Sequence, residues 1–168
     1  GTAAIVEFPG VLYRGGAEQK IRKYLIDNNY VDTVFQLPPD LFFGTSIATC
    51  IIVLKKSKKD NSILFVDGSA EFVHEGNKNK LSAANIDRLL TAFVERRDVD
   101  HFCKLVPCEE VVANDCNLSV SSYVEQEDTR EEVDIVELNR SIAEIVARQQ
   151  VLRNEIDKIV AELGECRM

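Results

Sequence analysis

Phe35-Gln-Leu-Pro-Pro-Asp-Leu-Phe-Phe-Gly-Thr-Ser-Ile-Ala-Thr-Cys-Ile-Ile-Val-Leu54 holds two predicted strands joined by an aromatic loop. The first strand covers residues 31–37. The second covers residues 47–55, which are nearly all apolar and are expected to be buried on both faces. A Pro-Pro turn and a glycine lie between the strands and place Phe42 and Phe43 at the mouth of a sheet. Flat side chains at such a place can stack against a planar ligand such as a nucleobase.

The adjacent rings of Phe42 and Phe43 have two interpretations. In an extended segment, neighbouring side chains point to opposite faces, so one ring can enter the core while the other faces a cleft. From the residues alone, packing of both rings in the core is favoured over stacking against a ligand. Enzymes that modify a base in duplex DNA hold the extruded base between flat side chains, so the stacking interpretation stays open.

Hydrophobic periodicity predicts the elements on either side of this stretch. The predicted elements are a buried strand at 3–8, a helix at about 16–28, a strand at 62–67, a loop at 68–81 and a helix at 82–97. Residues 99–123 are expected to be mixed, with short strands or turns, and irregular as a whole. The helix at 82–97 begins at the N-cap Ser82, and its predicted buried face consists of Ile86, Leu89, Leu90, Phe93 and Val94.

The segment from about residue 129 to residue 163 is predicted to form one long helix. Its apolar residues alternate three and four positions apart, which is the a/d pattern of a coiled coil, with a polar residue at Gln149. The seam consists of Ile135, Leu138, Ile142, Ile145, Gln149, Leu152, Ile156, Ile159 and Leu163. Gly164 is expected to cap the helix. One helix cannot bury such a stripe within itself, so the stripe must pack on another chain or on another part of the intact protein.

Composition and charge narrow the classes of function. The 168 residues suit one globular domain with an appendage, and no apolar run approaches the ~20 residues that a membrane helix needs. The net charge of −8 argues against a protein that coats nucleic acid with its whole surface. Basic residues nevertheless gather in the first half of the chain, where Lys55, Lys56, Lys58 and Lys59 are candidates for contacts with DNA phosphates. A solvated lysine turn is the alternative interpretation.

The sequence offers no hydrolytic, ATP-binding or strong metal-binding motif. Neither of its two histidines lies near a G-x-S-x-G elbow, and no G-x-x-x-x-G-K-[ST] loop is present. His101, Cys103, Cys108 and Cys116 suggest zinc ligands, but no two of the cysteines have the Cys-x2-Cys spacing of structural zinc sites. We therefore predict no metal site and expect the reduced thiols of a cytoplasmic protein.

Several segments, taken in order, resemble the modification subunits of type I restriction-modification systems, which are adenine-N6 DNA methyltransferases. They are Gly10-Val-Leu-Tyr-Arg-Gly-Gly-Ala-Glu-Gln-Lys-Ile-Arg22, Leu37-Pro-Pro-Asp-Leu-Phe-Phe-Gly-Thr45 and Ile51-Ile-Val-Leu-Lys55. Ile63-Leu-Phe-Val-Asp-Gly-Ser69, Asn117-Leu-Ser119 with Tyr123, and the long helix continue the resemblance. The similarity covers nearly the whole chain.

This resemblance implies an α/β fold in two parts. Residues 1–124 would form the C-terminal half of a Rossmann-like, S-adenosylmethionine-dependent methyltransferase domain, and residues 125–168 a coiled-coil tail for subunit association. The family's glycine-rich cofactor turn and its Asn-Pro-Pro-aromatic tetrad are not in this chain, and Leu37-Pro-Pro-Asp40 has the prolines without the Asn or the aromatic. Both motifs would lie upstream of Gly1. The chain is therefore expected to be a C-terminal fragment, inactive alone, with no catalytic or cofactor-binding residue.

The resemblance also implies roles for the remaining residues. Phe43, with Phe42 as second choice, would lie against the flipped adenine. The subunit interface would consist of Leu138, Ile142, Ile145, Gln149, Leu152, Ile156 and Ile159. The expected partners are DNA and the specificity and restriction subunits, with self-association through the tail as a further possibility. A non-catalytic assembly module that acts only through its heptad helix is the alternative function.

Overall fold

The computed structural model describes residues 1–126 and 135–165, and for residues 162–165 it describes only the backbone. The chain divides into two compact units, Gly1–Glu127 and Asp128–Met168. The first unit is a mixed α/β structure, and the second contains the long helix α5 (Ile135–Glu165). Among the described helices, none is long and apolar enough to span a membrane.

A five-stranded mixed sheet forms the centre of the first unit. Its strands, in spatial order, are β1 (Thr2–Glu7), β3 (Cys50–Lys55), β2 (Val31–Gln36), β4 (Ser62–Asp67) and β7 (Cys103–Pro107). β3 is antiparallel to both β1 and β2, and β2 is parallel to β4. β7 is antiparallel to β4. Consequently β1, β2 and β4 run in the same direction, and their carboxyl ends lie at one edge of the sheet.

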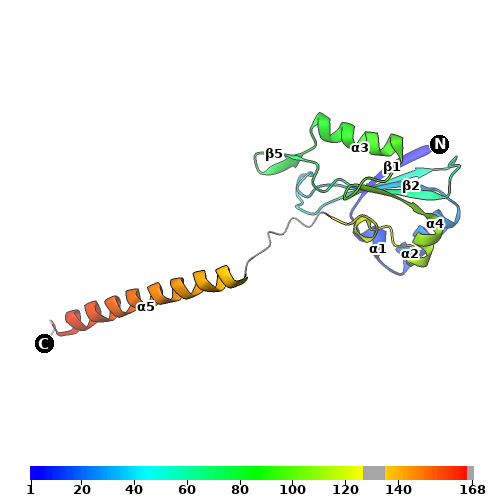
Figure 1. Ribbon diagram of the computed structural model, residues 1–168. Helices are drawn as coiled ribbons and strands as arrows, with labels where there is room; N and C mark the ends of the chain where they lie inside the picture. The colour runs from blue at the N-terminus through cyan, green and yellow to red at the C-terminus, as the bar shows by residue number, and fades with distance from the viewer. Residues whose placement is uncertain (127–134, 166–168) are drawn as a thin grey trace. The chain divides into compact units, whose positions relative to one another are not determined.

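Helices cover both faces of this sheet (Figure 1). α3 (Ala83–Glu95) lies on one face, and α1 (Gly10–Tyr13), α2 (Ala17–Asp27) and α4 (Cys108–Ala113) lie on the other. The alternation of side chains along the strands separates two buried clusters. The cluster around Phe65 and Ile26 packs under α2 and α4, and the cluster around Val66 and Leu89 packs under α3.

The structure contains elements in two segments that the sequence did not predict to be regular. The predicted loop at 68–81 contains a hairpin of β5 (Val73–Glu75) and β6 (Lys78–Lys80), which Gly76 turns with a φ of 64°. The segment predicted to be irregular, 99–123, contains β7, α4 and a 3-10 turn at Val120–Ser122. The last helix extends further at its C-terminal end than predicted, because α5 continues through Gly164 to Glu165 instead of being capped there. Residues 129–134 of the predicted helix, and the side chain of Leu163, lie outside the described residues.

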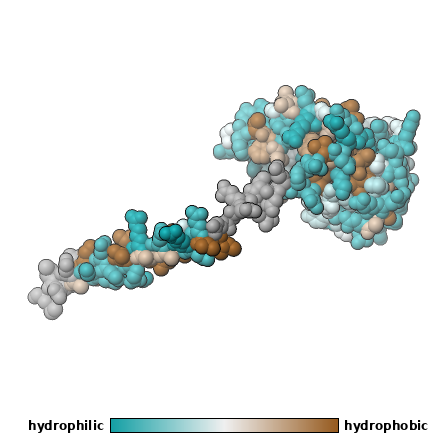
Figure 2. Space-filling model, viewed as in Figure 1, coloured by the Kyte–Doolittle hydropathy of each residue, from teal (hydrophilic) through white to brown (hydrophobic). Residues whose placement is uncertain are grey.

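Several predictions of burial were wrong, although the elements themselves were found. All six residues of β1 are exposed, because β1 is the edge strand of the sheet and pairs only with β3 among the described strands. On α3, Leu89 and Ala92 are buried, whereas Ile86, Leu90 and Val94 are exposed. Apolar side chains thus reach the surface of both units, as Figure 2 shows.

A buried ion pair fixes the end of α3 to the sheet. Asp32 of β2 has a side chain only 3% exposed, and its Oδ2 accepts hydrogen bonds from Arg96 Nη1 at 3.0 Å and from Thr33 Oγ1 at 2.9 Å. Arg96 is the C-cap of α3 and has a left-handed φ of 47°. The pair satisfies a carboxylate that would be costly to bury alone.

Gly68, directly after β4, has no room for a side chain, because atoms of Gln36 and Leu89 approach its Cα closely. A Cβ at this position would lie 2.9 Å from the carbonyl oxygen of Gln36 and 2.9 Å from Leu89 Cδ2. We expect Gly68→Ala to lower the free energy of unfolding by about 1–3 kcal/mol, since the backbone and core must shift. Urea unfolding measures the change. Gly15→Ala is the matched control, because a Cβ there meets no atom within 4 Å; equal stability of the two variants would contradict the prediction.

Candidate functional site

The candidate site lies at the edge of the sheet where β1, β2 and β4 end. This carboxyl edge consists of the residues that follow Glu7, Gln36 and Asp67. In open α/β sheets, ligands bind in the crevice outside the carboxyl ends of the strands, where loops rather than strand backbone form the surface. The segment that joins β2 to β3, residues 37–49, emerges at this edge, and we call it the aromatic loop.

The aromatic loop carries Phe43 fully into solvent. Phe43 is 100% exposed and Phe42 is 43% exposed, so neither ring belongs to the core. The interpretation favoured from the residues alone, in which both rings pack in the core, was therefore wrong, and neither ring enters the core as the alternative allowed. The reason is local geometry: Asp40 and Gly44 have positive φ values of 57° and 79°, so the backbone turns and the side chains do not alternate as in a strand.

The base of the aromatic loop is held by hydrogen bonds to the carbonyl oxygen of Thr49. Leu37 N donates to Thr49 O at 2.8 Å, and Gln36 Nε2 donates to the same oxygen at 3.3 Å. The Oγ1 of Thr49 is buried and has no hydrogen-bond partner among the described residues. These contacts close the loop at its two ends and leave its tip outside the sheet.

The β5–β6 hairpin supports the tip of the aromatic loop. Lys78 Nζ lies 3.4 Å from Phe42 O, 3.3 Å from Thr45 O and 3.4 Å from Asp40 Oδ1. Asn79 Nδ2 donates to Pro39 O at 2.8 Å. Sequence reasoning missed this support because it predicted residues 68–81 to be a loop.

Polar groups of β4 and of the segment after the 3-10 turn also meet at the carboxyl edge. Asp67 accepts hydrogen bonds from Ser69 N at 2.9 Å and from Gln126 Nε2 at 3.1 Å. Gly68 N donates to Gln36 O at 2.9 Å. Asp67 is thus committed to internal contacts, and the exposed groups of this edge are mainly those of the aromatic loop.

The four candidate lysines lie at the opposite end of β3 from the aromatic loop. β3 has six residues, so the two sites are separated by about 20 Å along the strand at roughly 3.3 Å per residue. The Lys58 side chain is only 2% exposed, donates to Val31 O at 2.8 Å and pairs with Asp60. The prediction that Lys58 contacts phosphate was therefore wrong, because its ammonium is buried. Lys56 and Lys59 are exposed, and Lys55 is half-buried.

The zinc interpretation has no support in the geometry. Cys108 and Cys116 belong to the core cluster under α2 and α4, whereas Cys103 belongs to the cluster on the other face of the sheet. Within the described ranges, no group of three or more His, Cys, Asp or Glu residues is arranged to hold a metal ion. Burial raises the pKa of all three thiols, and it raises the pKa of Cys50 to about 11, so these cysteines are poor nucleophiles.

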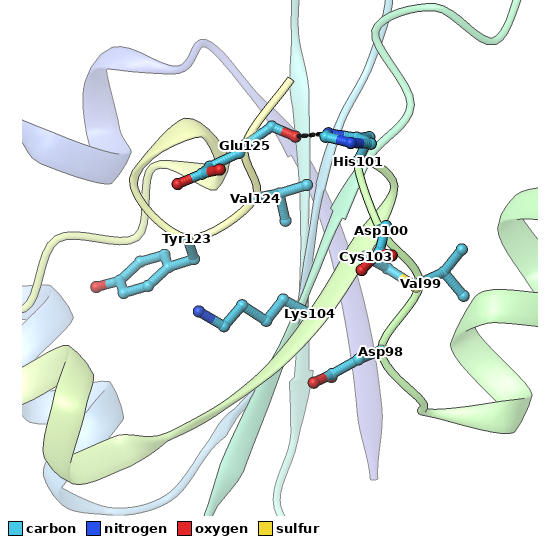
Figure 3. Close-up of a pocket in the computed structure, with 9 residues that line it drawn as sticks. All are labelled: Asp98, Val99, Asp100, His101, Cys103, Lys104, Tyr123, Val124 and Glu125. Atoms are coloured by element: carbon cyan, nitrogen blue, oxygen red, sulfur yellow. Dashed lines mark hydrogen bonds between the residues drawn. The ribbon is translucent and has the colours of Figure 1, made fainter. Parts of the chain in front are cut away.

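A cavity of about 290 Å³ opens beside the start of β7 (Figure 3). Its lining includes the acidic residues Asp98, Asp100 and Glu125 as well as Lys104. His101 Nδ1 lies 3.0 Å from Glu125 O. This contact links the turn before β7 to the segment after the 3-10 turn on the opposite side of the cavity. Asp98 Oδ1 accepts a hydrogen bond from Leu105 N at 2.8 Å, so this carboxylate is already engaged. Among the described residues that line this cavity, no nucleophile is hydrogen-bonded to a base, and we assign the cavity no chemistry.

The chain belongs to the N-6 DNA methylase family, whose sequence model matches residues 1–132. It is 49% identical over 164 residues to the type I restriction enzyme MpnII methylase subunit of Mycoplasma pneumoniae, with 97% of this chain and 30% of that protein covered. It is 37% identical over 167 residues to the MjaVIII methylase subunit of Methanocaldococcus jannaschii, with 94% and 29% covered.

A solved structure shows the same fold. The chain is similar to the type I restriction-modification system methyltransferase subunit of Streptococcus thermophilus, with a TM-score of 0.73 and 44% identity. This similarity covers 74% of the chain and 27% of that subunit. The chain therefore spans about 30% of the length of the relatives that it matches. The expected resemblance to type I modification subunits is confirmed at the level of the family.

Proposed function

We propose that this chain is the C-terminal part of a type I modification subunit. In the complete subunit, it helps to bind DNA and to hold the target adenine while a methyl group is transferred from S-adenosylmethionine to adenine N6. The observation that carries the proposal is the fully exposed Phe43 at the carboxyl edge of the sheet, in a chain of the N-6 DNA methylase family. An aromatic ring exposed to water in this way is available to stack on an extruded base.

The sheet supports a Rossmann-like arrangement in the complete domain. β1, α2 and β2 form a crossover between parallel strands, and the antiparallel β3 fills the position between them. Among the described strands, β1 pairs on one side only, with β3, and it presents the exposed apolar side chains of Ile5 and Val6. An edge of this kind is a template for further strands, and we propose that upstream strands of the same domain pair with β1.

We propose that the site for S-adenosylmethionine is formed by residues outside this chain. The sequence contains neither the glycine-rich turn nor the Asn-Pro-Pro-aromatic tetrad that the family uses, so we assign no cofactor contact and no transfer step to these residues. Phe43, with Phe42 as second choice, positions the base. Lys55, Lys56 and Lys59 stay candidates for phosphate contacts, although they lie at the other end of the sheet.

We expect the isolated chain to bind no S-adenosylmethionine and to transfer no methyl group. The complete subunit, assembled with its specificity subunit, is expected to do both. Isothermal titration calorimetry with the cofactor and a tritium-transfer assay on DNA measure the two properties. Tight cofactor binding by the isolated chain would overturn the assignment of the cofactor site to upstream residues. Absence of transfer by the complete assembly would overturn the proposed activity.

A second candidate function, an assembly module, is favoured by α5. The described side chains of this 31-residue helix are exposed, so the apolar residues of its heptad seam from Leu138 to Ile159 are not buried by any described residue. We propose that the seam pairs as a coiled coil with a helix of the specificity subunit, and that the restriction subunit joins the same complex. The tail and the base site can serve one enzyme, so the two functions are compatible.

A further inference from the structure

The side chain of Lys78 donates hydrogen bonds to the backbone of the aromatic loop on both sides of Phe43. Its ammonium group lies 3.4 Å from Phe42 O and 3.3 Å from Thr45 O, and these two carbonyl oxygens flank Phe43 and Gly44 in the sequence. Asp40 Oδ1, at 3.4 Å, is the third acceptor. A lysine ammonium has three N–H donors, so one side chain supplies a donor for each of the three oxygens.

Asn79 fixes the start of the same loop. Its side chain donates from Nδ2 to Pro39 O at 2.8 Å, and its backbone N–H donates to Asp40 O at 3.1 Å. Asn79 is buried, unlike most hairpin residues, because it sits between the hairpin and the loop. The left-handed backbone of Asp40 turns the chain at this point. Strand β6 therefore engages the carbonyl groups of Pro39, Asp40, Phe42 and Thr45.

The position of the Phe43 ring depends on the backbone of the loop alone. A ring that is fully exposed has no packing contacts of its own to hold it. A loop tip without such contacts samples many backbone conformations, and ordering it on binding a base costs entropy. Hydrogen bonds from Lys78 to both sides of Phe43 reduce that cost before the base arrives.

We propose that Lys78 is a positioning residue that presents Phe43 to the target base, with Asn79 as its second anchor. This role rests on the proposed stacking of the extruded adenine on Phe43. Lys78 itself has no contact with the base in this proposal, and its effect passes entirely through the aromatic loop.

The order of the loop can be tested in the chain itself. The sequence contains no tryptophan, so Phe43→Trp introduces a single tryptophan at the loop tip, which can be excited apart from the four tyrosines. In this background, Lys78→Met is expected to lower the steady-state anisotropy of the tryptophan. Lys80→Met is the matched control, because Lys80 lies on the same strand and pairs with Glu75 of the hairpin instead of the loop. Unchanged anisotropy in Lys78→Met, or an equal fall in both variants, would overturn the proposal.

The link to the base is tested in the complete subunit assembled with its specificity subunit. We expect Lys78→Met to lower kcat/KM for DNA methylation about tenfold when Phe43 is present, and less than about twofold in a Phe43→Ala background. With 2-aminopurine as the target base, the fluorescence of the Lys78→Met complex should approach that of Phe43→Ala, since the base loses its stacking partner. Lys80→Met should match the parent in both assays.

The pattern of results separates this proposal from the one on which it rests. Equal losses from Lys78→Met in the parent and in the Phe43→Ala background would show that Lys78 does not act through Phe43, and would overturn the positioning role. No effect of Phe43→Ala on kcat/KM or on fluorescence would overturn the stacking itself, and the role of Lys78 in base positioning would fall with it. The anisotropy result would still decide whether Lys78 orders the loop.

Discussion

Phe43→Ala is expected to lower kcat/KM for methylation of the target adenine by about 5-fold to 150-fold in the complete subunit. Stacking of one base on an aromatic side chain contributes roughly 1–3 kcal/mol, and the variant loses that contribution when the base is extruded. The same variant should leave the thermal stability of the chain unchanged, because the Phe43 ring is fully exposed and buries no surface. Single-turnover methylation and thermal unfolding measure the two effects.

Phe42→Ala is the matched control for this prediction. Phe42 is partly buried, so its truncation should lower stability by about 1 kcal/mol and affect methylation less than Phe43→Ala does. A larger loss of methylation in Phe42→Ala would reassign the stacking ring to Phe42. Wild-type rates in both variants would remove the aromatic loop from the base site.

The sequence predicts where the strands of this fold lie better than it predicts which strands are buried. The strand at 62–67 has the predicted bounds, and the strand at 31–37 ends one residue earlier, at Gln36. Runs of β-branched residues specify extended structure locally. They do not specify what covers a strand, which is why the apolar run of β1 appeared to be a buried strand although β1 is an exposed edge here. Hydrophobicity indicates a need for burial, but the covering partner is a tertiary property.

The support of the candidate site could have been found in part. Gly76-Asn77 between short extended segments is a two-residue hairpin signal, so β5 and β6 were predictable in principle. The contacts of Lys78 with the aromatic loop were not, because residues 78 and 42 are brought together only by the tertiary fold. The same reason applies to Lys58. A lysine in a polar turn is usually solvated, and only the tertiary fold brings the Lys58 ammonium group within hydrogen-bond distance of Val31 O.

Leu152→Asp is expected to abolish association with the specificity subunit, while the first unit keeps its stability. Leu152 lies near the middle of the heptad seam and is exposed in the described helix, so in the free chain the substitution costs only the lower helix propensity of Asp, a few tenths of a kcal/mol. In a coiled coil, its carboxylate would be buried among apolar side chains without a partner, which costs several kcal/mol and lowers affinity by at least about 100-fold. Analytical ultracentrifugation of the chain with its partner measures the loss. The matched control is Arg140→Asp, since Arg140 is highly exposed and lies outside the seam.

The charges that flank the seam indicate which partner it accepts. Gln149 and Ile156 occupy a positions, so Arg148 is a g residue and Arg153 is the e residue that it would meet across a parallel pair of identical helices. In such a pair, Arg148 of each helix would face Arg153 of the other, and these two contacts between like charges disfavour parallel self-association. A partner helix with acidic residues at the corresponding e and g positions would instead form ion pairs with both arginines. Arg148→Glu combined with Arg153→Glu should therefore weaken binding of the specificity subunit. Strong parallel dimerisation of the unmodified chain would contradict this reading of the charges, and retention of the complex by Leu152→Asp would exclude the seam as the subunit interface.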